Sequence, residues 1–202
     1  MSLPVALVAA SALLALVIGV VLPAPWVEML FEEGGFVESA TLVLYGFAIA
    51  AIWLPGKPHF GRVSAVAATF VLAACVARET SLRRWIIETA DGFFCCAHQV
   101  SASLTVVAVA ALVLAVVVLC RRHAVQVWRG LVRKEAVPMT LFAIFCATTL
   151  SQLFDRLPAL LSGQSLPMPS ALLALSLEET LELLIPVLVI MAALQARFGR
   201  AE

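Results

Sequence analysis

The chain of 202 residues is too hydrophobic for a water-soluble fold. Hydrophobic residues make up 63% of it, charged residues only 13%, and the mean hydropathy is +1.06, whereas a soluble domain carries about 25% charged residues. The formal net charge is zero and there is no basic tail or stripe, which excludes the electrostatic footprint of a nucleic-acid-binding protein. The composition therefore predicts an integral membrane protein, with the lipid bilayer as its surroundings.

Six transmembrane helices are predicted along the chain. A helix needs about 20 mostly apolar residues to cross a hydrocarbon core of roughly 30 Å, because it rises about 1.5 Å per residue. By this criterion the spans cover residues 3–22, 36–54, 62–77, 98–120, 137–154 and 176–196. The expected fold class is an all-α polytopic transmembrane bundle, in which residues 1–202 form a single integral membrane domain.

Residues 157–177 are uncharged but contain several helix-breaking residues. These are Pro158, Gly163, Pro167 and Pro169. Because proline removes a helical hydrogen bond and clashes with the preceding turn, this stretch is predicted to be a loop that lies on the membrane surface or dips into it. The alternative is a seventh span, which would place the C-terminus on the opposite side of the membrane.

The basic residues favour six spans over seven. With six spans, nine of the thirteen basic residues fall on one side, and the positive-inside rule makes that side cytoplasmic. These nine are Lys57, Arg62, Arg121, Arg122, Arg129, Arg133, Lys134, Arg197 and Arg200. Both termini are therefore expected in the cytoplasm.

The acidic residues gather at the opposite, outer end, although the orientation rule does not use them. Eleven of the thirteen fall there with only four basic residues. The acids are Glu28, Glu32, Glu33, Glu38, Glu79, Glu88, Asp91, Asp155, Glu178, Glu179 and Glu182, and the bases are Arg78, Arg83, Arg84 and Arg156. The outer end is thus acidic and the inner end basic, although the chain is neutral as a whole.

Two predicted spans are short enough to draw charges into the membrane. Fourteen uncharged residues separate Glu182 from Arg197, and fifteen separate Arg62 from Arg78, so that each stretch gives about 21 to 22 Å of helix against a core of roughly 30 Å. A charge at the centre of a membrane costs about 2.5 to 3.5 kcal/mol on insertion scales. These charged groups should therefore face the bundle interior, where they pair or become protonated.

The outer helix ends form the candidate functional site. It consists of Glu33, Glu38, Arg78, Glu79, Asp155, Arg156, Glu178, Glu179 and Glu182. Clustered carboxylates suit hard divalent cations, and closely spaced carboxylates can share a proton. The candidate metal ligands are Glu38, Glu79, Glu178, Glu182 and His98. A divalent cation is thus the one cofactor that the pattern suggests.

Three hypotheses follow for this cluster. The first is binding or transport of a proton or a divalent metal, with binding favoured because the inner half of the bundle offers few polar residues. The second is a non-catalytic structural or accessory subunit with a buried salt-bridge network, whose partner is a second copy of the chain or a membrane complex. The third is a membrane-embedded enzyme that acts on a lipid or prenyl substrate, with Glu179 or Glu182 as general base. The chain lacks the GxSG and HExxH motifs, and no catalytic residue is assigned.

Three stretches together resemble a pattern in uncharacterised bacterial polytopic inner-membrane proteins. They are Glu33-Gly34-Gly35-Phe36-Val37-Glu38, Ala77-Arg78-Glu79 and Glu178-Glu179-Thr180-Leu181-Glu182, fourteen residues in all. Where that pattern leads us to expect a further acid or histidine after Ala-Arg-Glu, this chain has Thr80, Ser81, Arg83 and Arg84. The resemblance implies a multi-pass protein of the bacterial inner membrane and the same site, and it implies no reaction.

Overall fold

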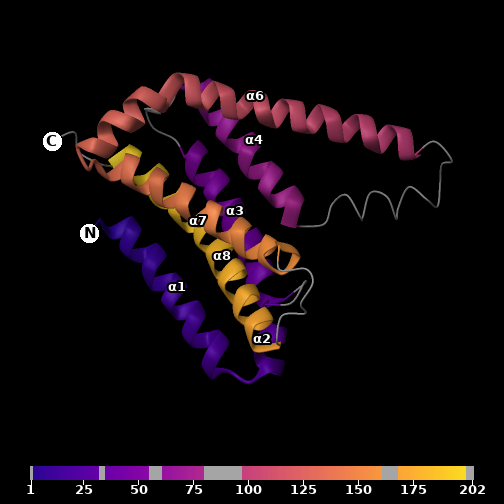
Figure 1. The fold of residues 1–202 in the computed structure, drawn as a ribbon. Helices are drawn as coiled ribbons and strands as arrows, with labels where there is room; N and C mark the ends of the chain where they lie inside the picture. Colours follow the sequence, from indigo (N-terminus) through magenta and orange to yellow (C-terminus); the bar gives the residue numbers. More distant parts are fainter. Residues whose placement is uncertain (1, 32–34, 55–60, 80–96, 161–167, 199–202) are drawn as a thin grey trace. The chain divides into compact units, whose positions relative to one another are not determined.

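The computed structural model describes residues 2–31, 35–54, 61–79, 97–160 and 168–198. These ranges hold helices and no strand (Figure 1), so the predicted all-α fold class is confirmed for the part of the chain that is described. The helices are α1 (Leu3–Val21), α2 (Ala24–Phe31), α3 (Phe36–Trp53), α4 (Arg62–Glu79), α6 (Ala97–Val132), α7 (Ala136–Leu160) and α8 (Met168–Phe198).

Five stretches are long and apolar enough to cross a membrane, and one of them runs across residues 32–34, which lie outside the described part of the chain. They are Leu3–Val21, Ala24–Trp53, Val107–Val132, Ala136–Leu157 and Ser170–Phe198. Helix α4 does not qualify because three of its 18 residues, Arg62, Arg78 and Glu79, are charged. The helices thus support a membrane-spanning chain, whereas the sixth span and the orientation of the termini stay predictions.

The predicted loop over residues 157–177 is wrong for most of its length. Helix α7 continues to Leu160 and α8 already begins at Met168, while residues 161–167 lie outside the described part. Pro169 occupies the second position of α8, where a missing N–H costs no intrahelical hydrogen bond. Proline therefore starts this helix instead of preventing it.

The other helix bounds differ from the predicted ones mainly in length. Helix α6 ends at Val132 and not at residue 120, and α2 was not predicted. The length criterion counts apolar residues only, whereas the backbone hydrogen bonds of a helix continue past the apolar stretch. Helix α2, with 8 residues, is too short for that criterion to detect.

The chain divides into two compact units. The first comprises Met1–Ala51 and Val127–Glu202, and the second Ile52–Gln126. The first unit therefore contains α1, α2, α7, α8 and most of α3, and the second contains α4 and most of α6.

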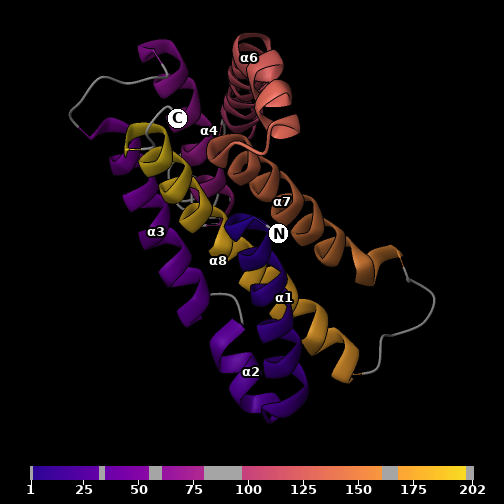
Figure 2. The ribbon, with the colours of Figure 1, turned by 90° about the vertical axis from the view of Figure 1, so that its left-hand side faces the viewer.

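Helix α8 is the centre of the first unit. It lies against α1 and α7 and also contacts α2, and Figure 2 shows α1 lying along it. One buried cluster joins α1, α7 and α8, and a second joins α2 and α3 to further leucines of α8. The first consists of Val8, Ala143, Ala147, Leu181, Leu184 and Leu188, and the second is Val27, Phe31 and Val37, packed against Leu172, Leu175 and Leu183.

Helix α7 presents a row of small residues to this interior. Thr140, Ala143, Ala147 and Ser151 are all buried, and their spacings of three and four residues place them on one helix face. Small side chains on such a face let two helix backbones approach closely in a membrane. We call these four residues the small-residue face of α7.

Helix α1 approaches α8 closely at Gly19. A Cβ atom at this position would lie 2.7 Å from Ser176 Oγ and 3.3 Å from Leu173 Cα. The Ser176 hydroxyl is itself placed at this contact, 3.0 Å from Leu173 O and 3.3 Å from Ala15 O. The missing side chain of Gly19 is therefore what permits the approach.

The substitution Gly19→Ala should destabilise the protein by about 1 to 3 kcal/mol, because the added methyl group overpacks a tight contact with α8. Thermal unfolding of the detergent-purified protein measures the effect. The matched control is Gly46→Ala in α3, where nothing lies within 4 Å of the added Cβ and where alanine should stabilise the helix by up to about 1 kcal/mol. Equal shifts in both variants would contradict the close approach at Gly19.

Candidate functional site

The structure describes seven of the nine predicted site side chains. Six lie in the first unit, namely Glu38, Asp155, Arg156, Glu178, Glu179 and Glu182, and Arg78 lies in the second. Glu33 and the side chain of Glu79 lie outside the described residues. Whether Arg78 and Glu79 meet the acids of the first unit therefore stays a prediction.

Glu182 is the most deeply buried carboxyl group that the structure describes. Only 4% of the residue is exposed, and the Ser151 hydroxyl, itself on a residue that is 1% exposed, donates a hydrogen bond of 2.7 Å to its Oε1. Helices α7 and α8 supply one partner each and lie side by side in both views (Figures 1 and 2). Glu182 and Ser151 thus form a buried, hydrogen-bonded pair between α7 and α8.

The small-residue face of α7 explains why Glu182 can be buried there. Ser151 ends that face, and its short side chain leaves room for the longer glutamate of α8. Burying a polar group in an apolar environment is costly unless it is hydrogen-bonded. The serine hydroxyl meets this requirement across the helix interface, so that the burial of Glu182 depends on Ser151.

A second polar pair crosses the same interface near its other end. Thr140 Oγ1 lies 2.7 Å from Gln195 Oε1. Counted along α7 and α8, the two pairs are 11 and 13 residues apart, or about 17 to 20 Å of helix. The buried residues of α7 and α8 between the two pairs are all apolar, so that an apolar layer separates the two pairs.

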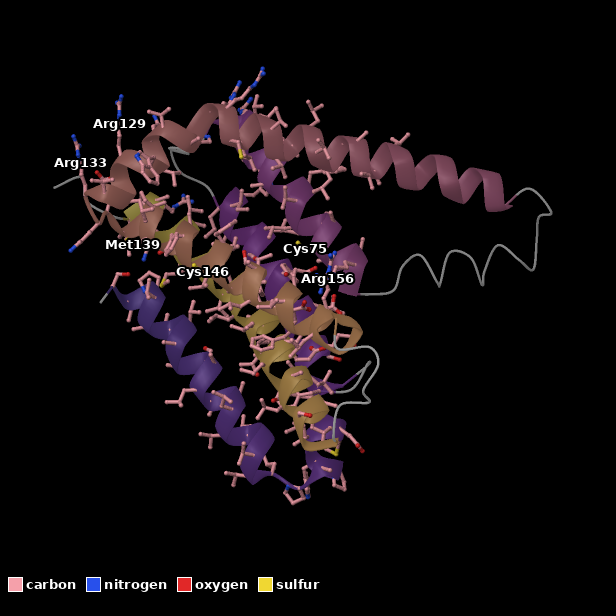
Figure 3. All side chains as sticks on the ribbon, viewed as in Figure 1. Cys75, Arg129, Arg133, Met139, Cys146 and Arg156 are labelled. Atoms are coloured by element: carbon pink, nitrogen blue, oxygen red, sulfur yellow. The ribbon has the colours of Figure 1, made fainter. Side chains whose placement is uncertain are left out.

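The other predicted acids of the first unit are more exposed than Glu182. Glu178 and Glu179 are half-buried on α8, and Glu38 is half-buried in the first turn of α3. Asp155 and Arg156 are exposed, about one turn beyond Ser151 on α7, and Figure 3 shows Arg156 near the end of that helix. Glu178 and Glu179 share α8 with the buried carboxyl, Asp155 and Arg156 share α7 with Ser151, and Glu38 lies on a different helix, α3.

The predicted metal site has no counterpart among the described side chains. No group of three or more His, Cys, Asp and Glu residues that could hold a metal ion is present in the searched part of the chain. The side chains of Glu79 and His98 are not among those described. A divalent metal site that uses them remains a prediction.

The second unit contains a serine and histidine pair that we did not predict. Ser64 Oγ on α4 lies 2.8 Å from His123 Nε2 on α6, and His123 Nδ1 lies 3.4 Å from Gln126 Oε1. A serine beside a histidine can act as a nucleophile. Ser64, however, is only 3% exposed, so a substrate cannot reach it in this conformation, and the pair acts here as a packing contact.

Sequence reasoning overlooked the partner of Glu182, although a signal was present. The spacing of Ala143, Ala147 and Ser151 is the small-residue repeat of a tightly packed membrane helix, which would have placed Ser151 at a helix interface. No comparable signal predicts Ser64 and His123, because 59 residues separate them in the sequence.

No protein-family model matches the chain, and neither a curated protein nor a solved structure shows significant similarity to it. Any functional assignment therefore depends on the geometry around Glu182.

Replacing Ser151 with alanine should destabilise the protein by about 1 to 3 kcal/mol, because the buried Glu182 carboxyl loses a hydrogen-bond donor. Unfolding in detergent is the measurement. Thr149→Ala is the control on the same helix, since Thr149 is exposed and its hydroxyl bonds only to Phe145 O of its own helix. If Ser151→Ala loses no more stability than Thr149→Ala, Ser151 does not stabilise the protein through its hydrogen bond across the helix interface.

Proposed function

We propose that this chain is a multi-pass membrane protein that binds a cation at Glu182, with a proton as the favoured cation. The observation that carries the proposal is the buried Glu182 carboxyl, 2.7 Å from Ser151 Oγ between two helices that are apolar enough to cross a membrane. Acidic residues inside a membrane are costly and usually serve ion or proton chemistry.

The surroundings of Glu182 favour a proton over a divalent metal. Calcium takes six to eight oxygen ligands and magnesium about six, while the described residues offer no group of three acidic, histidine or cysteine side chains for a metal. A proton needs one carboxylate oxygen. The Ser151 hydroxyl suits this task because a hydroxyl can donate to a carboxylate and can rotate to accept from a carboxylic acid.

The arrangement favours binding over translocation. Between Glu182 and the Thr140–Gln195 pair, the α7–α8 interface is filled by the apolar first core cluster. A proton cannot cross such a layer without polar groups or water to carry it. In the six-span topology that we propose, with α4 as the additional span and both termini in the cytoplasm, Glu182 is reached from the outer face of a bacterial inner membrane.

A structural role is the second candidate, and one observation favours it. The Ser151–Glu182 hydrogen bond joins α7 to α8 inside the first unit, where it could fix helix register without binding anything. An accessory subunit would need no more than this from the pair. The two candidates differ in whether the protonation of Glu182 changes under conditions in which the protein stays folded.

Infrared difference spectroscopy of the detergent-purified protein tests the proposal. Acidification should produce a carbonyl band of a buried carboxylic acid, which shifts in heavy water and disappears in Glu182→Gln. Ser151→Ala should keep the band but move its frequency, because the hydrogen bond to the carboxyl is lost. The control Glu135→Gln removes an exposed acid and should leave the band unchanged.

Two outcomes would decide against proton binding. A band that persists in Glu182→Gln would assign it to another acid and leave the structural role for this pair. Elemental analysis supplies the second outcome, since a stoichiometric metal that is present in the unaltered protein and lost in Glu182→Gln would identify the cation as a metal ion.

A further inference from the structure

The turn between α6 and α7 closes in a specific hydrogen-bonded geometry. Glu135 N–H donates to Gly130 O at 2.8 Å, and Lys134 N–H donates to Leu131 O at 3.1 Å. These two bonds form the Schellman motif, which ends a helix by placing one residue in the left-handed conformation. Lys134 is that residue, with a φ of 60°.

Lysine is an unusual choice for this position. Glycine adopts the left-handed conformation without steric cost, whereas other residues are strained there, and Lys134 is the one non-glycine residue with positive φ among those described. Such strain is often associated with function. The sequence thus keeps a positive charge where glycine would close the turn more easily.

Two arginines and two apolar side chains accompany Lys134 at the end of α6. Arg129, Arg133 and Lys134 are exposed, and none of the three is engaged by an ion pair with a described side chain. Trp128 and Val132 are 68% and 69% exposed. We call these five residues the basic turn.

The basic turn is divided into a charged side and an apolar side. Arg129 and Arg133 are four residues apart and therefore share one helix face, and Trp128 and Val132 share the neighbouring face. Figure 3 shows Arg129 and Arg133 extending outward from the end of α6. The single acid of the turn, Glu135, is folded back against Gly130, since its Oε2 would lie 2.7 Å from a Cβ atom at that position.

We propose that the basic turn binds the anionic headgroups of membrane phospholipids. The candidate span Ala136–Leu157 begins directly after this turn, which places the turn at the level of the headgroups. Arginine binds phosphate oxygens through two parallel hydrogen bonds, and tryptophan is enriched at the interface of membranes. The guanidinium groups would thus contact headgroup phosphates while Trp128 and Val132 lie against the upper acyl chains.

The apolar side of the turn distinguishes a lipid from a soluble phosphate. Arginine and lysine alone would bind either one, because both present the same phosphate oxygens. Trp128 and Val132 add a surface that only a lipid can cover. This site is separate from Glu182 and does not depend on the function proposed for that residue.

Quenching of Trp128 fluorescence by brominated lipids tests the proposal directly. The protein is made with Trp26, Trp53 and Trp85 replaced by phenylalanine and is reconstituted into phosphatidylcholine vesicles. Two vesicle preparations are compared. One contains brominated phosphatidylglycerol, and the other contains the same fraction of brominated phosphatidylcholine. Brominated phosphatidylglycerol should quench more strongly and show a higher apparent affinity, by about fivefold for each basic residue that contacts the headgroups.

The triple variant Arg129→Gln/Arg133→Gln/Lys134→Gln should bind the two lipids with about equal apparent affinity. The matched control Arg129→Lys/Arg133→Lys/Lys134→Arg keeps the three charges and should retain most of the preference. In the protein with an unaltered turn, a rise in salt concentration should weaken the preference for phosphatidylglycerol, because salt screens exposed charges.

Equal quenching by the two lipids in the protein with the unaltered turn would overturn the proposal. This result does not depend on the folding of any charge variant. Addition of inorganic phosphate supplies the remaining comparison. If inorganic phosphate at low concentration abolishes the preference, the site binds soluble phosphate and the lipid proposal is wrong.

Discussion

The close packing of α7 on α8 is the constraint on which the first unit depends. In lipid, helices gain little from burying apolar side chains against one another, so that association relies on tight contact and on hydrogen bonds between helices. The small-residue face of α7 supplies the contact, and the pairs at Ser151 and Thr140 supply hydrogen-bonding groups at its two ends. The position of Glu182 is a consequence of this packing.

The same packing changes the chemistry that the outer acids can perform. On the sequence alone, nine charged residues form one cluster, and a metal ion is a natural ligand for it. The structure instead places Glu182 in a buried pair with Ser151, whereas the other described acids of the predicted site, on α3, α7 and α8, are half-buried or exposed. The Ser151 hydroxyl can hydrogen-bond to the Glu182 carboxyl in either of its protonation states, which is the property that the proposed proton binding requires.

The buried Glu182 carboxyl and the basic turn lie in different surroundings, which give them different chemistry. The Glu182 carboxyl is buried beside apolar side chains, where a polar group must be hydrogen-bonded. The basic turn carries exposed charges where phospholipid headgroups would neutralise them. In the same turn, Lys134 adopts the left-handed backbone conformation, with a φ of 60°.

The sequence by itself determined that the chain is helical and apolar enough for a membrane, because composition and the length of apolar runs depend on no contact between helices. It also placed Glu182 among the nine residues of the candidate site, partly because only fourteen uncharged residues separate it from Arg197. Only the tertiary structure decided which partner Glu182 has, because Ser151 lies 31 residues away and meets it through helix packing. The structure likewise decided where α7 ends and α8 begins. Composition treats Pro158 and Pro169 only as helix breakers, whereas the structure includes both in helices.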